Sequence, residues 1–129
     1  MSKLQTLLSW FRKKEIPKPV IRLEATGFSL VEGASVALHI EWADVREIVA
    51  FKEDLVAYDE ICVGFRTDDT GQFWRVTEKS HHYQELLEEL PSRFAGIRTY
   101  WFSEVAFPGL VPNWTTLWGE PFRSQLDRE

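Results

Sequence analysis

The chain has 129 residues, of which 44% are hydrophobic and 27% charged, and its formal charge is −5. This length is typical of a single domain and is enough to bury a core without disulfides or structural metals. No stretch approaches the roughly 20 apolar residues of a membrane span, so we expect no spanning helix. The single cysteine, Cys62, excludes an internal disulfide, and its neighbours Ile61 and Val63 predict a buried thiol. This cysteine usage is typical of a reducing cytoplasm.

The charge is distributed unevenly along the chain. Residues 1–22 hold six basic side chains against one acidic side chain, which gives a formal charge of +5, and the remainder has −10. An acidic body argues against nucleic acid as a partner, because neutralisation of phosphates supplies most of that affinity. A basic segment on an acidic body instead suggests a specific role for the segment.

Residues 1–15 predict a basic amphipathic helix, which the sequence "IPKP" at 16–19 ends as a linker. Three fates remain open for this helix: packing on the rest of the chain, lying on an anionic membrane surface, or docking in a groove of a partner protein. The residues that would make the contact are Leu4, Leu7, Leu8, Trp10, Phe11, Arg12, Lys13 and Lys14.

From residue 20 the hydrophobic period changes from 3.6 to 2, which predicts β-strands. The apolar alternation and the turn residues between the segments indicate six short antiparallel strands. They cover residues 20–25, 28–32, 35–41, 47–52, 60–66 and 72–78.

A helical period returns after the last of these strands. Tyr83, Leu86, Leu87 and Leu90 form one apolar stripe, Ser80 is a candidate N-cap, and the following proline indicates an end near Leu90. The predicted fold class is therefore α+β. We expect an antiparallel six- or seven-stranded roll or partly open barrel, capped by one helix, in a single domain over residues 20–129.

The stretches "WADVREI", "FKEDL", "DEICVGF" and "FWRVTEKS" resemble small bacterial proteins with a pleckstrin-homology-like (PH-like) fold. The resemblance covers about residues 20–94 and implies a barrel closed by one helix. It implies binding of phosphoinositides, peptides or proteins, and the fold alone does not choose among them. The basic loop of the lipid-binding members is missing here, because "VEGAS" contains no Lys or Arg.

The stretch "YWFSEVAFPGLVPNWTTLW", residues 100–118, is rich in aromatic residues and has two interpretations. It is either an exposed aromatic site or the cover of the sheet that one helix leaves bare, and the second interpretation is favoured. "WTTLW" should return as a short edge strand, with Trp114, Thr116 and Trp118 on one face. The side chains expected to cover the sheet are Tyr100, Phe102, Val105, Phe107, Leu110 and Trp114; the three indoles that decide the question are Trp101, Trp114 and Trp118.

Paired carboxylates near one loop and in the following hairpin are a second candidate site. Such groups serve acid–base chemistry or cation binding when they are desolvated, but turn contexts favour solvated side chains. We therefore interpret them as an acidic edge that can face a basic partner. The residues of this edge are Glu53, Asp54, Asp59, Glu60, Asp68 and Asp69.

Catalytic and metal motifs are weak in the sequence. His81 and Glu85 have a metal-ligand spacing without a third ligand, and neither a G-x-S-x-G motif nor a glycine-rich phosphate loop is present. We expect no cofactor and no metal, and a protein that is not an enzyme.

The predicted function is a non-catalytic protein-interaction module. One version binds a basic protein partner, as immunity proteins of bacterial toxin systems do. The alternative is a peripheral membrane protein attached through residues 1–15. The expected location is the cytoplasm, either free or on the inner membrane surface, and the sequence does not determine the oligomeric state.

Overall fold

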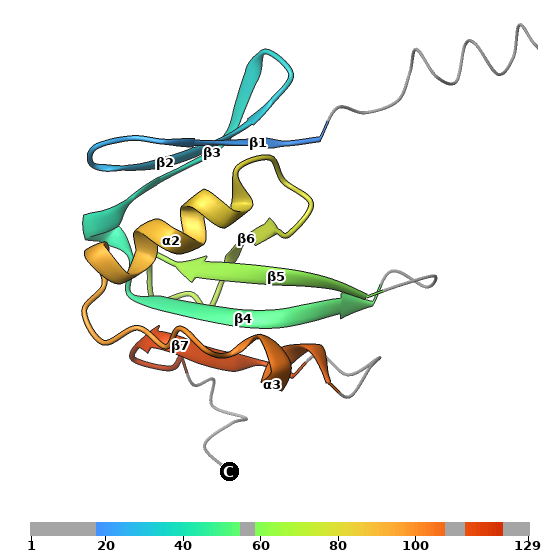
Figure 1. Cartoon of the computed structure of the whole chain (residues 1–129). Coiled ribbons are helices and arrows are strands. Elements are labelled where there is room, and N and C mark those ends of the chain that lie inside the picture. The colour runs from blue at the N-terminus through green and yellow to red at the C-terminus, as the bar shows by residue number, and fades with distance from the viewer. Residues whose placement is uncertain (1–17, 55–58, 108–112, 123–129) are drawn as a thin grey trace, which may run out of the picture.

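The computed structural model describes residues 18–54, 59–107 and 113–122 (Figure 1). The predicted helix over residues 1–15 lies outside the described residues, as do the first two residues of the 16–19 linker. The elements are β1 (Val20–Leu23), β2 (Gly27–Glu32), β3 (Ser35–Glu41), the 3-10 turn η1 (Trp42–Asp44), β4 (Glu47–Asp54), β5 (Asp59–Arg66), β6 (Trp74–Thr77), α2 (Tyr83–Arg93), α3 (Phe102–Ala106) and β7 (Thr115–Gly119).

The strands form two antiparallel sheets, one with the order β1-β2-β3 and one with the order β6-β5-β4-β7. The α+β class and the six predicted strands are confirmed, and β7 is the seventh. The continuous roll is not what the described residues show, because no ladder between described strands joins the two sheets and they form no closed barrel. The break falls at η1, where Trp42 is buried and its backbone N–H donates to Thr26 O at 2.8 Å. The chain leaves the first sheet there, and β4 pairs with β5 instead of β3.

One hydrophobic core connects both sheets with α2, which lies between them in Figure 1. The Phe28 ring of the first sheet contacts the Phe65 ring of the second, with centroids 5.0 Å apart. Leu86 and Leu90 of α2 are buried in the same cluster. The predicted apolar stripe of this helix therefore positions it across the opening between the sheets.

The boundaries of α2 differ from the prediction at both ends. Ser80 is not the N-cap; His82 takes that position in the left-handed region, with φ of 68° and no side-chain cap bond. Pro91 lies inside the helix, which continues to Arg93. The last turn tolerates the proline because the helix ends two residues later.

β7 confirms the predicted strand at "WTTLW" and pairs antiparallel with β4. The strict alternation expected along it is wrong, because the register shifts between Ile48 and Val49. At such a bulge two consecutive residues can turn toward the same side. Leu117 is buried, and the neighbouring Trp118 also packs against the core, with its ring 4.8 Å from that of Phe94.

The rest of the aromatic stretch is divided between core and surface. Trp101 and Val105 are buried, which fits one face of the unpredicted helix α3 at spacing i, i+4. The expectation that Tyr100, Phe102 and Phe107 cover the sheet is wrong, because they are exposed to 96%, 58% and 70%. Trp114 is 55% exposed, but its indole stacks on the Phe51 ring of β4 with centroids 4.2 Å apart, so it covers part of the sheet as expected. Leu110 lies outside the described residues.

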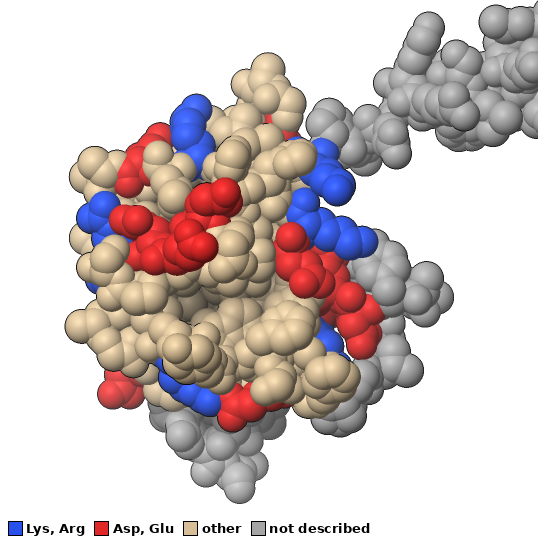
Figure 2. Space-filling view, in the orientation of Figure 1, with Lys and Arg blue, Asp and Glu red and all other residues tan. Residues whose placement is uncertain are grey.

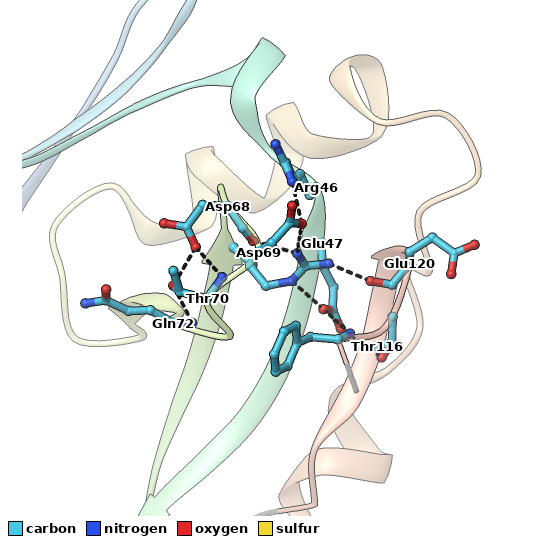
Figure 3. A network of polar contacts seen from close by, with 10 residues as sticks. Arg46, Glu47, Asp68, Asp69, Thr70, Gln72, Thr116 and Glu120 are labelled. Carbon is cyan, nitrogen blue, oxygen red and sulfur yellow. Dashed lines mark hydrogen bonds and ion pairs between the residues drawn. The ribbon is translucent and has the colours of Figure 1, made fainter. Parts of the chain in front are cut away.

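A buried polar cluster, which we call the clamp, fixes the chain after β7 to β4 and β5 (Figure 3). Arg66 donates through Nε to Glu47 Oε1 at 3.0 Å, through Nη1 to Asp68 O at 2.7 Å and through Nη2 to Glu120 O at 2.8 Å. Glu47 Oε1 also accepts the backbone N–H of Phe122 at 2.8 Å. The C-terminal segment is thus an integrated part of the fold up to residue 122.

Candidate binding groove

A groove of about 770 Å³ lies between α2 and residues 97–102. Glu78 and residues 80–82 also line it, and Leu117 of β7 lies at its base. Figure 2 shows this face of the molecule, where acidic side chains gather over α2 above a hollow in the surface. A concave surface of this size is the usual place for a bound ligand or peptide.

The floor of the groove is apolar, and the period of α2 explains why. Leu86 and Leu90 face the core, whereas Tyr83 and Leu87 are half-buried and lie one turn apart on the flank beside the groove. Trp101, buried in the core cluster, contributes from the opposite side. The floor is therefore an extension of the hydrophobic core that reaches the surface.

The second wall is fixed to the sheet by backbone contacts. After α2 the chain reverses at Gly96, whose φ of +81° is rarely adopted by a residue with a side chain. Ile97 N then donates to Phe94 O at 3.2 Å, and Arg98 N donates to Leu117 O at 3.0 Å. This wall follows β7, so the shape of the groove depends on the C-terminal segment.

The rim of the groove is predominantly acidic. Glu85 and Glu88 project from α2, and the Glu85 side chain is 56% exposed with a 3.7 Å contact to His82 Nδ1. Glu88 has no ion-pair partner among the residues that the structure describes. The one guanidinium on the lining, that of Arg98, already pairs with Glu104. The rim therefore favours a cationic ligand.

Exposed aromatic rings border the acidic groove. Phe102 lines it and is largely exposed, and its neighbour Tyr100 is almost fully exposed. Aromatic side chains of this kind are the residues that most often anchor protein interfaces. The groove and these rings together make a surface that is apolar in the middle and acidic along the helix side.

Tyr83 contributes a buried hydroxyl to the wall of the groove. Its oxygen has no hydrogen-bond partner among the described residues. Burial, and then the nearby charge of Glu78, raises the pKa of the Tyr83 phenol above its usual range. The hydroxyl therefore stays protonated at neutral pH.

The predicted acidic edge is not a single surface in the structure. Glu53 and Glu60 lie opposite one another at one end of the β4–β5 pair, whereas Asp68 and Asp69 follow its other end, roughly 20 Å away along β5. Asp54 and Asp59 are paired by backbone register at the first end, and the side chain of Asp54 lies outside the described ones.

Three of these six carboxylates have ion-pair partners. Glu53 pairs with Arg75, and Asp59 Oδ2 lies 3.6 Å from the buried Lys52 Nζ. At the other end Asp69 pairs with Arg46. Their charges are largely compensated within the fold, so the groove is the better candidate for a basic partner.

Sequence patterns did not reveal a row of hydrogen-bonded polar side chains on the outer face of the three-stranded sheet. Ser29 Oγ lies 2.8 Å from His39 Nδ1, and His39 Nε2 lies 2.7 Å from Glu41 Oε1. The hydrogen bond from His39, followed by one from Thr26, lowers the pKa of Glu41. The register of the β2–β3 hairpin shifts between Leu30 and Val31, and this shift places Ser29 opposite His39.

This serine–histidine–carboxylate line lacks the features of a nucleophilic site. Ser29 is only 2% exposed and lies in the middle strand of its sheet, where neighbouring strands use the backbone N–H groups. An oxyanion needs free donors next to the nucleophile. Neither the groove nor the smaller cavity beside β3, of about 370 Å³, is lined by Ser29.

Metal ligation finds no geometric support among the described residues, where no three His, Cys, Asp or Glu side chains gather as a metal site. His81 and Glu85 both line the groove without a third ligand. In the part of the chain that is described, no helix has the length and hydropathy of a membrane span.

No protein-family model matches the chain, and neither a curated protein nor a solved structure shows significant similarity to it.

Proposed function

We propose that the protein is a binding module whose groove takes an apolar and basic segment of a partner protein. The observation that carries this proposal is the combination of an apolar floor with an acidic rim in one concave surface. In this mode, apolar side chains of the ligand fill the groove and its cations lie along the carboxylates. The acidic rim also accelerates the encounter with a positively charged partner.

The PH-like resemblance is retained as part of this proposal. It rests on the stretches from "WADVREI" to "FWRVTEKS", and PH-like domains include protein and peptide binders. A cytoplasmic location is proposed on the same basis, together with the cysteine usage.

Binding explains the polar groups better than catalysis does. The deeply buried charged side chains Arg66, Glu47 and Lys52 are occupied by hydrogen bonds and ion pairs within the fold. Ser29 is inaccessible, as described above. The groove, by contrast, exposes apolar surface that has no evident structural purpose.

Membrane attachment through residues 1–15 is the alternative, and the groove face disfavours it for this side of the molecule. Exposed rings such as Tyr100 and Phe102 suit a lipid interface, but Glu85 and Glu88 lie beside them. These carboxylates would be repelled by the negative potential of an anionic leaflet.

The test is a titration of the isotope-labelled full-length chain with two designed amphipathic peptides, one of Leu and Lys and one of Leu and Glu. We expect the Leu/Lys peptide to shift the amide signals of Leu87, Ile97 and Phe102, and the Leu/Glu peptide to leave them unchanged. Binding should weaken as salt is raised, because the acidic rim is exposed and therefore screened.

A pair of matched double variants tests the site. Glu85→Lys with Glu88→Lys should weaken binding of the Leu/Lys peptide about tenfold, the size expected when close charge pairs become repulsive. Glu32→Lys with Asp44→Lys changes the net charge equally, at exposed positions that do not line the groove, and should have little effect. Equal weakening by both pairs would show nonspecific charge attraction and contradict the proposal. Tight binding of anionic vesicles by a chain that ignores both peptides would support the membrane alternative instead.

A further inference from the structure

We propose that residues 1–15 of the chain itself occupy the groove and so compete with the partner. This inference rests on the proposed function, because it names the regulation of the same site. The basic segment is then an intramolecular occupant that a partner displaces.

The segment joins the described fold beside the groove. Pro19 O accepts the backbone N–H of His81 at 2.9 Å, and Ile21 N donates to His81 O at 2.9 Å. His81 lines the groove. The chain before Pro19 therefore begins at one end of the groove, next to the first turn of α2.

The lengths of the segment and of α2 are compatible with docking. A helix of 15 residues is about 22 Å long, whereas α2, with its 11 residues, extends about 16 Å. The four residues of the 16–19 linker span at most about 14 Å when extended. The segment is therefore long enough to run beside the whole of α2 without leaving its attachment point.

The segment and the groove are chemically complementary. The apolar face predicted for the segment, with Leu4, Leu7, Leu8 and Phe11, matches the apolar floor of the groove. Its cations are concentrated at positions 12–14, nearest to the attachment point. Glu78 and Glu85 line that same end of the groove.

The tether makes even a weak contact effective. A short linker gives an effective concentration on the order of 1 mM, so a groove affinity of about 100 µM would leave the segment docked about ten times more often than free. A partner that needs the free groove would then bind about tenfold more weakly to the whole chain than to one whose segment cannot dock.

The experiment places a nitroxide label on the full-length chain at Ser9→Cys. Cys62 is fully buried, so the introduced thiol is the one that reacts. We expect strong broadening of the amide signals of Leu87, Ile97 and Phe102. The signal of Gly33, at the tip of the β2–β3 hairpin, should be unaffected.

Two variants control the experiment. Leu7→Asp with Leu8→Asp breaks the apolar face and should abolish the broadening, whereas Ser2→Asp with Gln5→Asp adds the same charge and should preserve it. Broadening that is absent or uniform in the labelled chain would overturn the inference. Broadening of unlabelled molecules mixed with labelled ones would also overturn it, because a second copy would then hold the segment.

The Leu/Lys peptide separates this inference from the proposed function. We expect it to bind the Leu7→Asp, Leu8→Asp chain about tenfold more tightly than the native chain. Equal binding to both chains, without broadening, would overturn the intramolecular contact and leave the binding function standing. A third outcome is broadening in the native chain without peptide binding to either the native chain or the Leu7→Asp, Leu8→Asp chain. It would support the intramolecular contact and overturn the proposed function.

Discussion

The clamp and the groove use charged side chains in opposite ways. In the clamp, Arg66 and Glu47 are almost completely buried, and each of the three guanidinium nitrogens donates to an acceptor. On the groove rim, the side chain of Glu85 is more than half exposed, and Glu88 has no ion-pair partner among the described residues. Charges of the first kind determine whether the chain folds. Those of the second kind add little stability and remain available to a ligand.

The largest expected effect breaks the clamp. Arg66→Ala leaves the Glu47 carboxylate buried without its cation, together with two backbone carbonyls that lose their donors. We expect the free energy of unfolding, measured by urea titration, to fall by about 3–5 kcal/mol. Arg46→Ala is the control, because Arg46 is exposed and pairs with the exposed Asp69, and it should cost less than about 1 kcal/mol.

A double variant separates the ion pair from the backbone contacts. Replacing both Arg66 and Glu47 by Met removes the buried charges, and such replacements are often neutral elsewhere. Here recovery should be only partial, because Asp68 O, Glu120 O and Phe122 N would still lack partners. Full recovery would show that the clamp is no more than an ion pair.

The same contrast of buried and exposed side chains exists inside residues 100–118. Val105 is fully buried, and Phe107, two residues later, is 70% exposed. Val105→Ala should lower the free energy of unfolding by about 2 kcal/mol through lost burial and a small cavity. Phe107→Ala should change it by less than about 0.5 kcal/mol. A similar loss for both variants in urea titrations would show that the outer ring also packs, and the division of this stretch would be wrong.

The elements of the fold were largely predictable, because hydrophobic period and turn residues are local signals. Six strands and the stripe of α2 followed from them. The division into two sheets was not, since it depends on Trp42 entering a core built from distant residues. The short helix α3 was missed because "FSEVA" has only one turn, and a single buried Val105 does not establish a period.

The candidate site was less predictable than the fold. The hydrophobic period predicted the apolar stripe of α2, and three of its residues, Tyr83, Leu87 and Leu90, line the groove. What patterns could not supply is the opposite wall, because it forms only when Gly96 reverses the chain and Arg98 bonds to β7. The Ser29–His39 contact shows the same limit, since a register shift that no motif encodes brings the two residues together.

Cys62 is a titratable group that belongs to neither the clamp nor the groove. Its ionisation should have the smallest effect on the free energy of unfolding. Burial, and then the charge of Glu53, raises the pKa of its thiol to about 12. At pH values below about 8.5 the thiol is protonated in both the folded and the unfolded chain, so it has no pH-dependent effect there. Above that pH the unfolded chain loses the proton and the folded chain keeps it, so stability falls as pH rises toward 12. Between pH 8 and 9.5 this group should remove about 1 kcal/mol from the free energy of unfolding. Urea titrations at several pH values, for the native chain and for Cys62→Ala, measure how steeply the free energy of unfolding falls with pH. Equal pH dependence in both chains would mean that the thiol ionises as easily in the fold as in water.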